Sequence, residues 1–423
     1  MILAIDLGST SFKAAIFDRR LRQLASGSAR LAHRFGRGGC AEIEVANVHA
    51  ALRGALAAAK VSTHEIKLIA LTSQAQTFTL VDAKGRDLIP FISWQDTRSA
   101  NACAELKRKL ADIGEHSSFG EVLSGMQISH LRRVRPGSRT MPLKLPTYIT
   151  RLWSGESVMD TNLAAMSGLY SLPLQGWWPD ALRACGLNER QMPRLIPVGE
   201  IATLTTSAAK RFGLPAGVPI VLAGNDQTAG GYAARLETGK SLLITLGTAQ
   251  AVYACCARMP RPRAGTIRGS YPDGKFYRMA SDSCGGNVVN WAQTIIAGCD
   301  DDARFFREAA GAPQGCHGLA FDSALNTGNG RWQSLALHHT PADLARSVLE
   351  SLSQRTADLV RRLGLTLQGR RLLVAGGGGR QPLWRQMVAD ALGAKLDVTE
   401  ARPLLGAARM AARHLPGGAP SDG

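Results

Sequence analysis

The sequence is short of acidic and aromatic side chains and has no long apolar run. No apolar stretch of the 423 residues approaches the length of about 18 that a membrane helix needs, so we expect no membrane span. No charged and apolar leader precedes the first strand pattern, which favours a cytoplasmic location. Fifty Lys and Arg stand against 33 Asp and Glu, and the formal net charge is +17. The most basic segments, 131–139 and 258–263, contain no aromatic residues for base stacking. We therefore expect a basic solvated surface that suits phosphate-bearing ligands, and no nucleic-acid partner.

Cysteine motifs are also missing. No CxxC pair and no Cys/His spacing typical of a metal site occurs, so the sequence predicts neither zinc nor disulfides. The eight cysteines are scattered at Cys40, Cys103, Cys185, Cys255, Cys256, Cys284, Cys299 and Cys316.

What the chain does have is alternation of strand and helix patterns. Residues 66–72 and 77–81 read as strands, and 48–60 reads as a helix. A second helix is expected over 341–363, with Thr340 as N-cap; Leu344, Val348, Leu352, Leu359 and Leu363 share one of its faces. Strand 371–375, a four-glycine turn and a helix follow. This order predicts an α/β architecture.

The opening segment 2–18 is a hairpin pattern, ILAIDLGSTSFKAAIFD, and residues 242–253 repeat it as LLITLGTAQAVY. In each, two apolar runs flank a turn that contains Gly and Thr. Two hairpins about 240 residues apart in sequence, each leading into α/β segments, predict two similarly built halves with a cleft between them.

The first turn has the chemistry of a phosphate site. Backbone N–H groups of Gly8, Ser9, Thr10 and Ser11, helped by hydroxyls and by Lys13, can converge on phosphate oxygens. Asp6 ends the preceding strand, where a carboxylate could hold a magnesium-bound water. The alternative is a plain type I′ hairpin turn. Neither turn is a P-loop, because GxxxxGK[ST] is absent.

The segment DLGSTSFK at 6–13 resembles the first phosphate motif of the actin, Hsp70 and sugar-kinase superfamily, in the form of the FGGY carbohydrate kinases. Further matches follow in family order at 73–85, 92–99, 213–231, 245–253, 285–291, 374–393 and 404–412. The resemblance, to a xylulose-kinase-like subgroup, implies two ribonuclease-H-like domains of the actin-like ATPase fold around a cleft. We expect them at 1–236 and 237–423, with ATP and Mg²⁺ as cofactors.

The family likeness makes Asp226 in GNDQ the general base that accepts the proton of a sugar hydroxyl. Its alternative role is that of a helix N-cap. Gln227 resembles the sugar-contacting neighbour in the family, with a structural amide at a helix start as the alternative.

The sugar is expected against 73–77 and 92–99, where side chains can bind hydroxyls and cover a sugar face. Those side chains are Gln76, Trp94, Asp96 and Arg98. Two alternatives stay open: Trp94 as ordinary core, and an Asp96–Arg98 pair that braces the loop. Xylulose-kinase-like relatives commonly carry Met-His, and glycerol kinases Arg-Glu, where this chain has Ala75-Gln76, so the sugar is not defined.

For the nucleotide, the resemblance places the first turn and Lys13 at the outer phosphates, with Gly247 and Thr248 opposite. The adenosine side would be lined by Gly286, Asn290, Gly377 and Gln381. The four-glycine turn favours a purine and ribose packed on bare backbone; its alternative is a tight strand-to-helix crossover.

These observations predict an ATP-dependent kinase of a small sugar or polyol, with a ketose such as xylulose as the expected substrate. We also expect a hinge near 236–241 and a homodimer. One alternative is a catalytically degenerate sugar- or nucleotide-binding protein on the same fold. An actin-like or chaperone-type ATPase is disfavoured by SWQDTR and GNDQ. The segments 101–139 and 311–337 match the family poorly, which predicts a smaller or more open sugar pocket.

Overall fold

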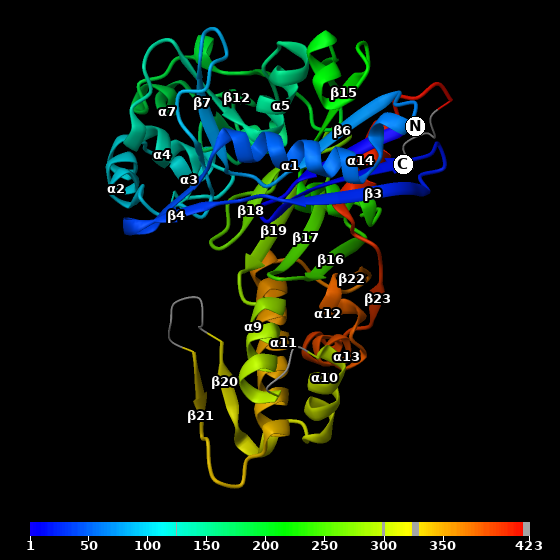
Figure 1. The fold of residues 1–423 in the computed structure, drawn as a ribbon. Coiled ribbons are helices and arrows are strands. Elements are labelled where there is room, and N and C mark those ends of the chain that lie inside the picture. Colours follow the sequence, from blue (N-terminus) through cyan, green and yellow to red (C-terminus); the bar gives the residue numbers. More distant parts are fainter. Residues whose placement is uncertain (124, 298–300, 324–329, 418–423) are drawn as a thin grey trace.

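The computed structural model describes residues 1–123, 125–297, 301–323 and 330–417. Two halves lie one above the other in Figure 1, the first coloured blue to green and the second green to red. Each half is built on a six-stranded sheet. Part of the 311–337 segment, residues 324–329, lies outside the described residues.

The sheet of the first half has the order β14-β15-β6-β1-β2-β3. Its parallel core of β15, β6 and β1 is extended by antiparallel neighbours on both sides. The strands are β1 (Ile2–Leu7), β2 (Ser11–Phe17), β3 (Gln23–Arg30), β6 (Leu68–Ser73), β14 (Ile201–Leu204) and β15 (Pro219–Asn225).

The sheet of the second half has the order β18-β19-β17-β16-β22-β23. The strands β18, β19, β17 and β16 pair antiparallel, and two parallel strands follow, β22 beside β16 and then β23. Its strands are β16 (Ser241–Leu246), β17 (Gln250–Cys256), β18 (Ile267–Tyr271), β19 (Lys275–Asp282), β22 (Arg371–Ala375) and β23 (Leu396–Val398). The predicted repeat is confirmed: each opening hairpin, β1–β2 or β16–β17, lies within the interior of its sheet.

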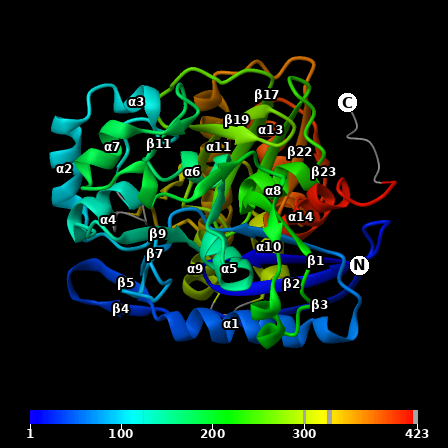
Figure 2. The same ribbon diagram turned by 90° about the horizontal axis from the view of Figure 1, so that it is seen from above.

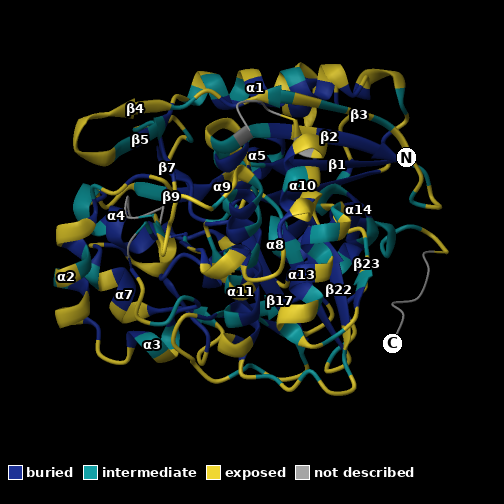
Figure 3. Cartoon of the chain, turned by 90° about the horizontal axis from the view of Figure 1, so that it is seen from below, coloured by how far each residue is buried: buried dark blue, intermediate teal, exposed yellow. Residues whose placement is uncertain are grey.

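Helices cover both faces of the first sheet. The helices α1 (Val45–Ala58) and α5 (Leu145–Ser154) contribute to a core that contains Leu52 and Ile149. Figure 3 shows β1 and β2 as dark blue, buried strands next to α1. The opposite face packs against α8 (Asp226–Ala233) and α14 (Pro403–Ala412). The final helix of the chain therefore crosses back onto the first half, and the boundary at 236/237 stays a prediction.

A side lobe extends the first half around a sheet of order β4-β5-β8-β7-β9. Figure 2 shows its helices gathered at the side away from β1 and β2. The strands are β4 (Arg34–Gly36), β5 (Cys40–Ile43), β7 (Phe78–Asp82), β8 (Phe91–Ile92) and β9 (Thr140–Lys144). The helices are α2 (Ala100–Lys109), α3 (Ile113–His116), α4 (Gln127–Val134) and α7 (Pro179–Ala184). Short elements complete the half: β10 (Val158–Asp160), α6 (Thr161–Ala165), β11 (Tyr170–Ser171), β12 (Gly176–Trp177) and β13 (Arg194–Ile196).

Helices of the second half pack on its sheet and extend below it in Figure 1. They are α9 (Gly286–Ala292), α10 (Asp302–Gly311), α11 (Pro341–Leu363), α12 (Gly377–Arg380) and α13 (Pro382–Leu392), beside the hairpin of β20 (Ala320–Asp322) and β21 (Arg331–Gln333). Among the described residues, no helix combines the length and the apolar character that crossing a bilayer requires.

The predicted elements are present with small shifts at their ends. The helix over 341–363 has the predicted bounds, and Thr340 caps it in a capping box with Asp343. The residues of its predicted buried face are buried, except Leu344, which is half-buried. The helix expected from residue 48 begins at Val45, and the strand expected from residue 66 begins at Leu68. Ends differ because helix and strand ends fray, and periodicity does not fix the terminal residue of an element.

Candidate active site

The carboxyl ends of the parallel strands β1, β6 and β15 meet at one edge of the first sheet. Asp6 pairs with Thr72 on β6, and Ser73 pairs with Asn225 on β15. On its other side Asp6 pairs with Lys13 of β2. Open α/β sheets place ligands at such an edge. The fold therefore brings the predicted metal residue, the phosphate turn and the start of α8 into one acidic corner.

Asp226 is the first residue of α8, at this corner. The N-cap is Asn225, whose side chain accepts a 3.0 Å hydrogen bond from the Thr228 N–H. The alternative role of Asp226 as the N-cap is therefore wrong. Its Oδ1 accepts a 2.8 Å hydrogen bond from the Gln227 N–H, and both residues are half-buried. A carboxylate held this way keeps an oxygen for a substrate at the positive end of the helix.

Burial raises the pKa of both carboxyl groups at the corner. For Asp6, burial and the nearby Asp226 raise the pKa to about 7, while Lys13 opposes the shift. For Asp226, burial raises the pKa, and its hydrogen bond from Gln227 and the charge of Lys13 act against this. A carboxylate whose pKa is raised is a stronger base than an ordinary one, which suits proton abstraction from a hydroxyl.

The acidic corner fits a hard cation. Asp6 is 7% exposed, and its Oδ1 has no hydrogen-bond partner among the described residues. The neighbouring carboxyl group of Asp226 raises the pKa of Asp6, so a cation between them would relieve their repulsion. Carboxylate oxygens are also the ligands that Mg²⁺ prefers. The donor set therefore matches the predicted metal.

Asn162 holds the start of α8 in place, a role that sequence reasoning missed. Its side chain accepts a 2.9 Å hydrogen bond from the Asn225 N–H and donates to Thr228 Oγ1 at 2.9 Å. It also donates at 2.7 Å to the Ser270 carbonyl in the second half. Gly224 has a φ of +70°, and a Cβ there would lie 2.9 Å from Asn162 Oδ1. No sequence motif marks this side chain, because its partners come from distant segments.

The first turn is shaped by bonds to its carbonyl groups. Leu7 pairs with Phe12, which leaves four residues between them, so the turn is not the two-residue type I′ turn of the alternative interpretation. The carbonyl groups of Gly8, Ser9 and Thr10 bond to Gln74, His33 and Leu31 respectively.

The exposed side of the first turn carries Thr10 and Lys13, with Ser9 and Ser11 half-buried. Since the carbonyl groups are engaged elsewhere, the N–H and hydroxyl groups are the ones left to face an anion.

The second turn joins the predicted adenosine residues. Gly286 donates a 2.7 Å hydrogen bond to the Gly247 carbonyl, and Asn287 donates to the Thr248 carbonyl at 3.2 Å. A Cβ at Gly286 would lie 2.9 Å from the Gly247 oxygen, so this contact requires glycine. Thr248 and Asn290 are exposed.

Packing explains most of the four-glycine turn. A Cβ at Gly376 would lie 2.5 Å from the Leu246 carbonyl, one at Gly378 2.3 Å from Trp384, and one at Gly379 3.0 Å from Val374. Gly377 alone faces open space and is exposed. The crossover alternative therefore accounts for three glycines, and Gly377 is the one available to a nucleotide. Gln381, two residues beyond Gly379, is the N-cap residue of α13.

On the predicted sugar side, Trp94 is exposed. Its exposure of 46% excludes the alternative of an ordinary core residue. The tryptophan backbone N–H donates to Thr77 Oγ1 at 3.3 Å, which ties its loop to the residue just before β7.

Asp96 and Arg98 brace the loop. Arg98 Nη2 lies 2.6 Å from Asp96 Oδ2 and also binds Glu42. Burial alone would raise the pKa of Asp96, but hydrogen bonds from Arg98 and the Ala41 N–H hold it below its usual value. Cys40 lies close to the carboxylates of Asp96 and Glu42, yet Arg98 and Arg34 already pair with them, so we assign no metal there. These contacts favour the bracing alternative, with the pair behind the predicted sugar-binding loops.

Gln76 is also engaged with protein groups. Its amide donates to the Met166 carbonyl, and its Oε1 accepts a 3.2 Å hydrogen bond from the Gln127 N–H. The Gln127 side chain is 1% exposed and has no hydrogen-bond partner among the described residues. Because 101–139 matches the family poorly, no motif pointed to Gln127 or to the buried His130 one turn along α4.

Two similar halves, with an acidic corner beside a glycine- and hydroxyl-rich turn, are the arrangement of an ATP-dependent phosphotransferase. Residues 1–232 match the N-terminal domain of the FGGY family of carbohydrate kinases, and residues 242–415 match its C-terminal domain. The chain belongs to this family, and it is a carbohydrate kinase that uses ATP.

Relatives and solved structures agree with this assignment. The chain is 26% identical over 430 residues to an L-fuculokinase of Salmonella typhi, covering 95% of this chain and 89% of the relative. It is 27% identical over 374 residues to a xylulose kinase of Escherichia coli K12, covering 83% of this chain and 76% of the relative. The crystal structure of xylulose kinase from Rhodospirillum rubrum superposes with a TM-score of 0.86 at 23% identity, covering 97% and 90%. A gluconate kinase structure from Lactobacillus acidophilus superposes with a TM-score of 0.89 at 19% identity, covering 97% of this chain and 88% of that structure. The predicted xylulose-kinase-like resemblance and two-domain actin-like fold are thereby confirmed.

Proposed function

We propose that this kinase transfers the terminal phosphate of ATP to a hydroxyl of a small ketose such as xylulose, with Asp226 as the general base. The proposal is supported most by the placement of Asp226. Its carboxylate lies at the first turn of α8, half-buried, with a raised pKa and with Lys13 nearby. The presence of both Asp6 and Asp226 at one edge of the sheet, beside the phosphate turn, disfavours the degenerate alternative.

Different residues of the chain have different roles in the proposed reaction. Asp226 accepts the proton of the attacking hydroxyl, while the N–H groups of the turns at 8–11 and 247–248 hold phosphate oxygens. Gln227 beside it orients the sugar, and the exposed ring of Trp94 covers a C–H face. Gln76, Asp96 and Arg98 act through the loops that they hold, because their polar atoms bind protein groups.

The nucleotide is expected across the second turn. Gly286 and Gly377 let backbone approach the adenosine, with Asn290 and Gln381 at its edge. Asp6 would hold Mg²⁺, and when bound this ion neutralises charge on the transferred phosphoryl group. A cytoplasmic location, the domain boundary at 236/237 and a homodimer stay predictions.

Relatives favour a ketose without defining it. Xylulose kinases occur among both the similar sequences and the similar structures, but an L-fuculokinase and a glycerol kinase match at comparable identity. Gln76, at the position that differs from those relatives, is buried, and both polar atoms of its side chain bind protein groups, which favours a structural role. Selection among sugars must therefore come from the shape around Trp94 and α8.

A coupled ADP-release assay across ketoses, aldoses and polyols tests the proposal. The full chain should turn over one ketose with the highest kcat/KM, and Asp226→Asn should lower kcat by about 10²–10⁴ while sugar affinity, measured by calorimetry, changes little. The matched control is Asp180→Asn, the same change at an exposed carboxylate on α7. Near wild-type turnover by Asp226→Asn would contradict the assignment of Asp226 as the base. A preference for a polyol or an aldose would contradict the proposal that the substrate is a ketose.

A further inference from the structure

A second cavity lies away from the acidic corner, where the two halves join. Its volume is about 1080 Å³, just above the usual range for small-molecule sites. The linking segment 234–240 forms one wall, and the β18–β19 turn forms another. The end of α14 and the β2–β3 turn close it from the first half. We call this cavity the hinge pocket.

Basic side chains dominate the hinge pocket. Seven of its lining residues are Arg or Lys and two are acidic, which leaves an excess of five positive charges. The cations are Arg19, Arg235, Lys240, Lys275, Arg371, Arg409 and Arg413, and the acids are Glu237 and Asp273. A concave surface with this charge excess concentrates anions.

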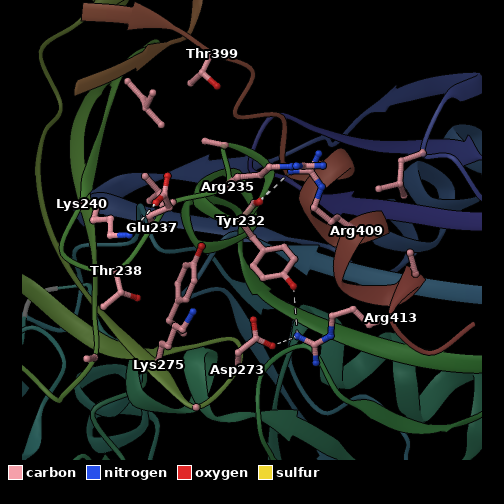
Figure 4. A pocket seen from close by; sticks show the side chains of 18 of the residues that line it. Tyr232, Arg235, Glu237, Thr238, Lys240, Asp273, Lys275, Thr399, Arg409 and Arg413 are labelled. Carbon is pink, nitrogen blue, oxygen red and sulfur yellow. Dashed lines mark hydrogen bonds and ion pairs between the residues drawn. The ribbon is translucent and has the colours of Figure 1, made fainter. Parts of the chain in front are cut away.

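Part of this charge is compensated, because both acids pair with cations of the pocket and Arg371 lies 3.7 Å from Asp397. Arg413 binds Asp273 and also Glu200, and Figure 4 shows it joined to Asp273 and to the Tyr232 hydroxyl. Lys240 lies 3.8 Å from Glu237. Arg19 and Lys275, by contrast, form no ion pair with any residue that the structure describes. They contribute uncompensated charge from opposite halves of the molecule.

The walls also offer hydroxyl and apolar groups. Thr238, Thr399 and Tyr232 can donate hydrogen bonds, and Figure 4 shows them around the same space. Leucines from the β2–β3 turn, the linking segment, β22 and the chain after α14 supply apolar surface, at Leu21, Leu236, Leu373 and Leu415. This mixture suits an organic body that carries phosphate groups.

Two elements run from the hinge pocket to the catalytic groups. The helix α8 begins at Asp226 and reaches the pocket at Tyr232, a distance of about 9 Å along its axis. Strand β16 begins beside Lys240 and ends at Leu246, next to the second phosphate turn. Arg409, a pocket residue, donates hydrogen bonds to the carbonyl groups of Tyr232 and Ala233 at the end of α8.

We propose that the hinge pocket is a regulatory site for a small phosphorylated metabolite, distinct from the sugar and ATP sites. A polyanion attracted into the pocket by Arg19 and Lys275 would fix the linking segment and, through α8 and β16, bias the relative position of the two halves. This proposal goes beyond the kinase reaction and does not depend on the identity of the sugar.

Binding of inorganic pyrophosphate, with EDTA present and neither sugar nor nucleotide, provides the test. Calorimetry with the full chain should show binding at a site that Arg19→Gln/Lys275→Gln weakens about tenfold or more, because two charge-assisted contacts are lost. The matched control, Arg108→Gln/Lys109→Gln, removes the same charges from exposed positions of α2 and should bind as wild type. Both double variants should keep basal kinase activity.

A third variant distinguishes pyrophosphate binding in the hinge pocket from binding at the phosphate turns. Lys13→Gln lies in the acidic corner and should leave pyrophosphate binding unchanged. Pyrophosphate should also slow hydrogen exchange of amides 234–240 in the wild type but not in Arg19→Gln/Lys275→Gln. Absence of binding, equal weakening in both double variants, or loss of binding in Lys13→Gln alone would each overturn the proposal.

Discussion

Asp6 illustrates how one residue acquires its chemistry from burial. Its carboxyl group is 7% exposed, with one oxygen unpartnered among the described residues, and stands beside a second carboxyl group. We expect Asp6→Asn to weaken the dependence of turnover on Mg²⁺ much more than sugar affinity, since the predicted sugar residues lie on other loops. Turnover against Mg²⁺ concentration and calorimetry with the sugar measure the two effects. A fall in sugar affinity with unchanged metal dependence would contradict the placement.

His130 provides a pH-dependent effect on stability. Its ring is 1% exposed, neither ring nitrogen has a hydrogen-bond partner among the described residues, and Nδ1 lies 3.9 Å from Asp96. Burial lowers the pKa of His130 to about 4, whereas the unfolded chain titrates near 6.5. Between these values the unfolded chain binds the proton and the folded one does not, so stability is full above about 6.5 and falls towards pH 4.

We therefore expect acidification from pH 7.5 to pH 4.5 to cost the wild type up to about 3 kcal/mol more than it costs His130→Leu. Urea unfolding at the two pH values measures the difference. His338→Leu, at an exposed histidine, is the control and should follow the wild type. An equal loss in wild type and His130→Leu would show that this ring does not titrate as its burial implies.

At the scale of elements, the contact of α14 with α8 links the end of the chain to catalysis. A Cβ built on Gly406 would lie 1.7 Å from the Ala229 carbonyl, so only glycine allows this approach. Gly406→Ala should destabilise the protein by about 1–3 kcal/mol and lower kcat, because α8 carries Asp226 and must shift. Thermal unfolding and the kinase assay measure both.

Gly311→Ala is the matched control for that substitution. Gly311 ends α10, and a Cβ there would meet nothing within 4 Å. Since alanine favours helix over glycine, this variant should be unchanged or slightly more stable. Equal effects of the two substitutions would mean that the helix contact is not as tight as the packing indicates.

For the whole molecule, the two phosphate turns belong to different sheets, yet both are expected to bind one nucleotide. The halves should therefore close when ATP and sugar are bound, which also excludes water as a competing acceptor. The predicted hinge segment contains Gly239, which has a φ of +75° and where a Cβ would meet nothing within 4 Å, so it has room to adjust. Small-angle scattering with sugar and a non-hydrolysable ATP analogue should show a smaller radius of gyration. An unchanged profile at saturation would indicate a rigid, preformed site.

The elements and the repeat could be predicted from the residues alone, and the chemical class from the resemblance of short motifs to a known family. Two apolar runs around a Gly- and Thr-containing turn specify each hairpin locally, and the cap at Thr340 defines the start of α11 without reference to other segments. The motifs around Asp6 and Asp226 are likewise short and contiguous. Such signals can be read from neighbours in the chain, since their physical causes are backbone periodicity and local hydrogen bonds.

The use of the polar side chains, in contrast, depends on tertiary packing. Gln76, Asp96 and Arg98 look equally available in sequence, but partners from distant segments engage them, whereas Trp94 remains exposed. Asn162 connects α6, α8 and β18, and the hinge pocket draws charge from both halves. A hydrogen bond or an uncompensated charge depends on which groups the fold brings within about 3–4 Å, and that distance is set by the packing of the whole chain.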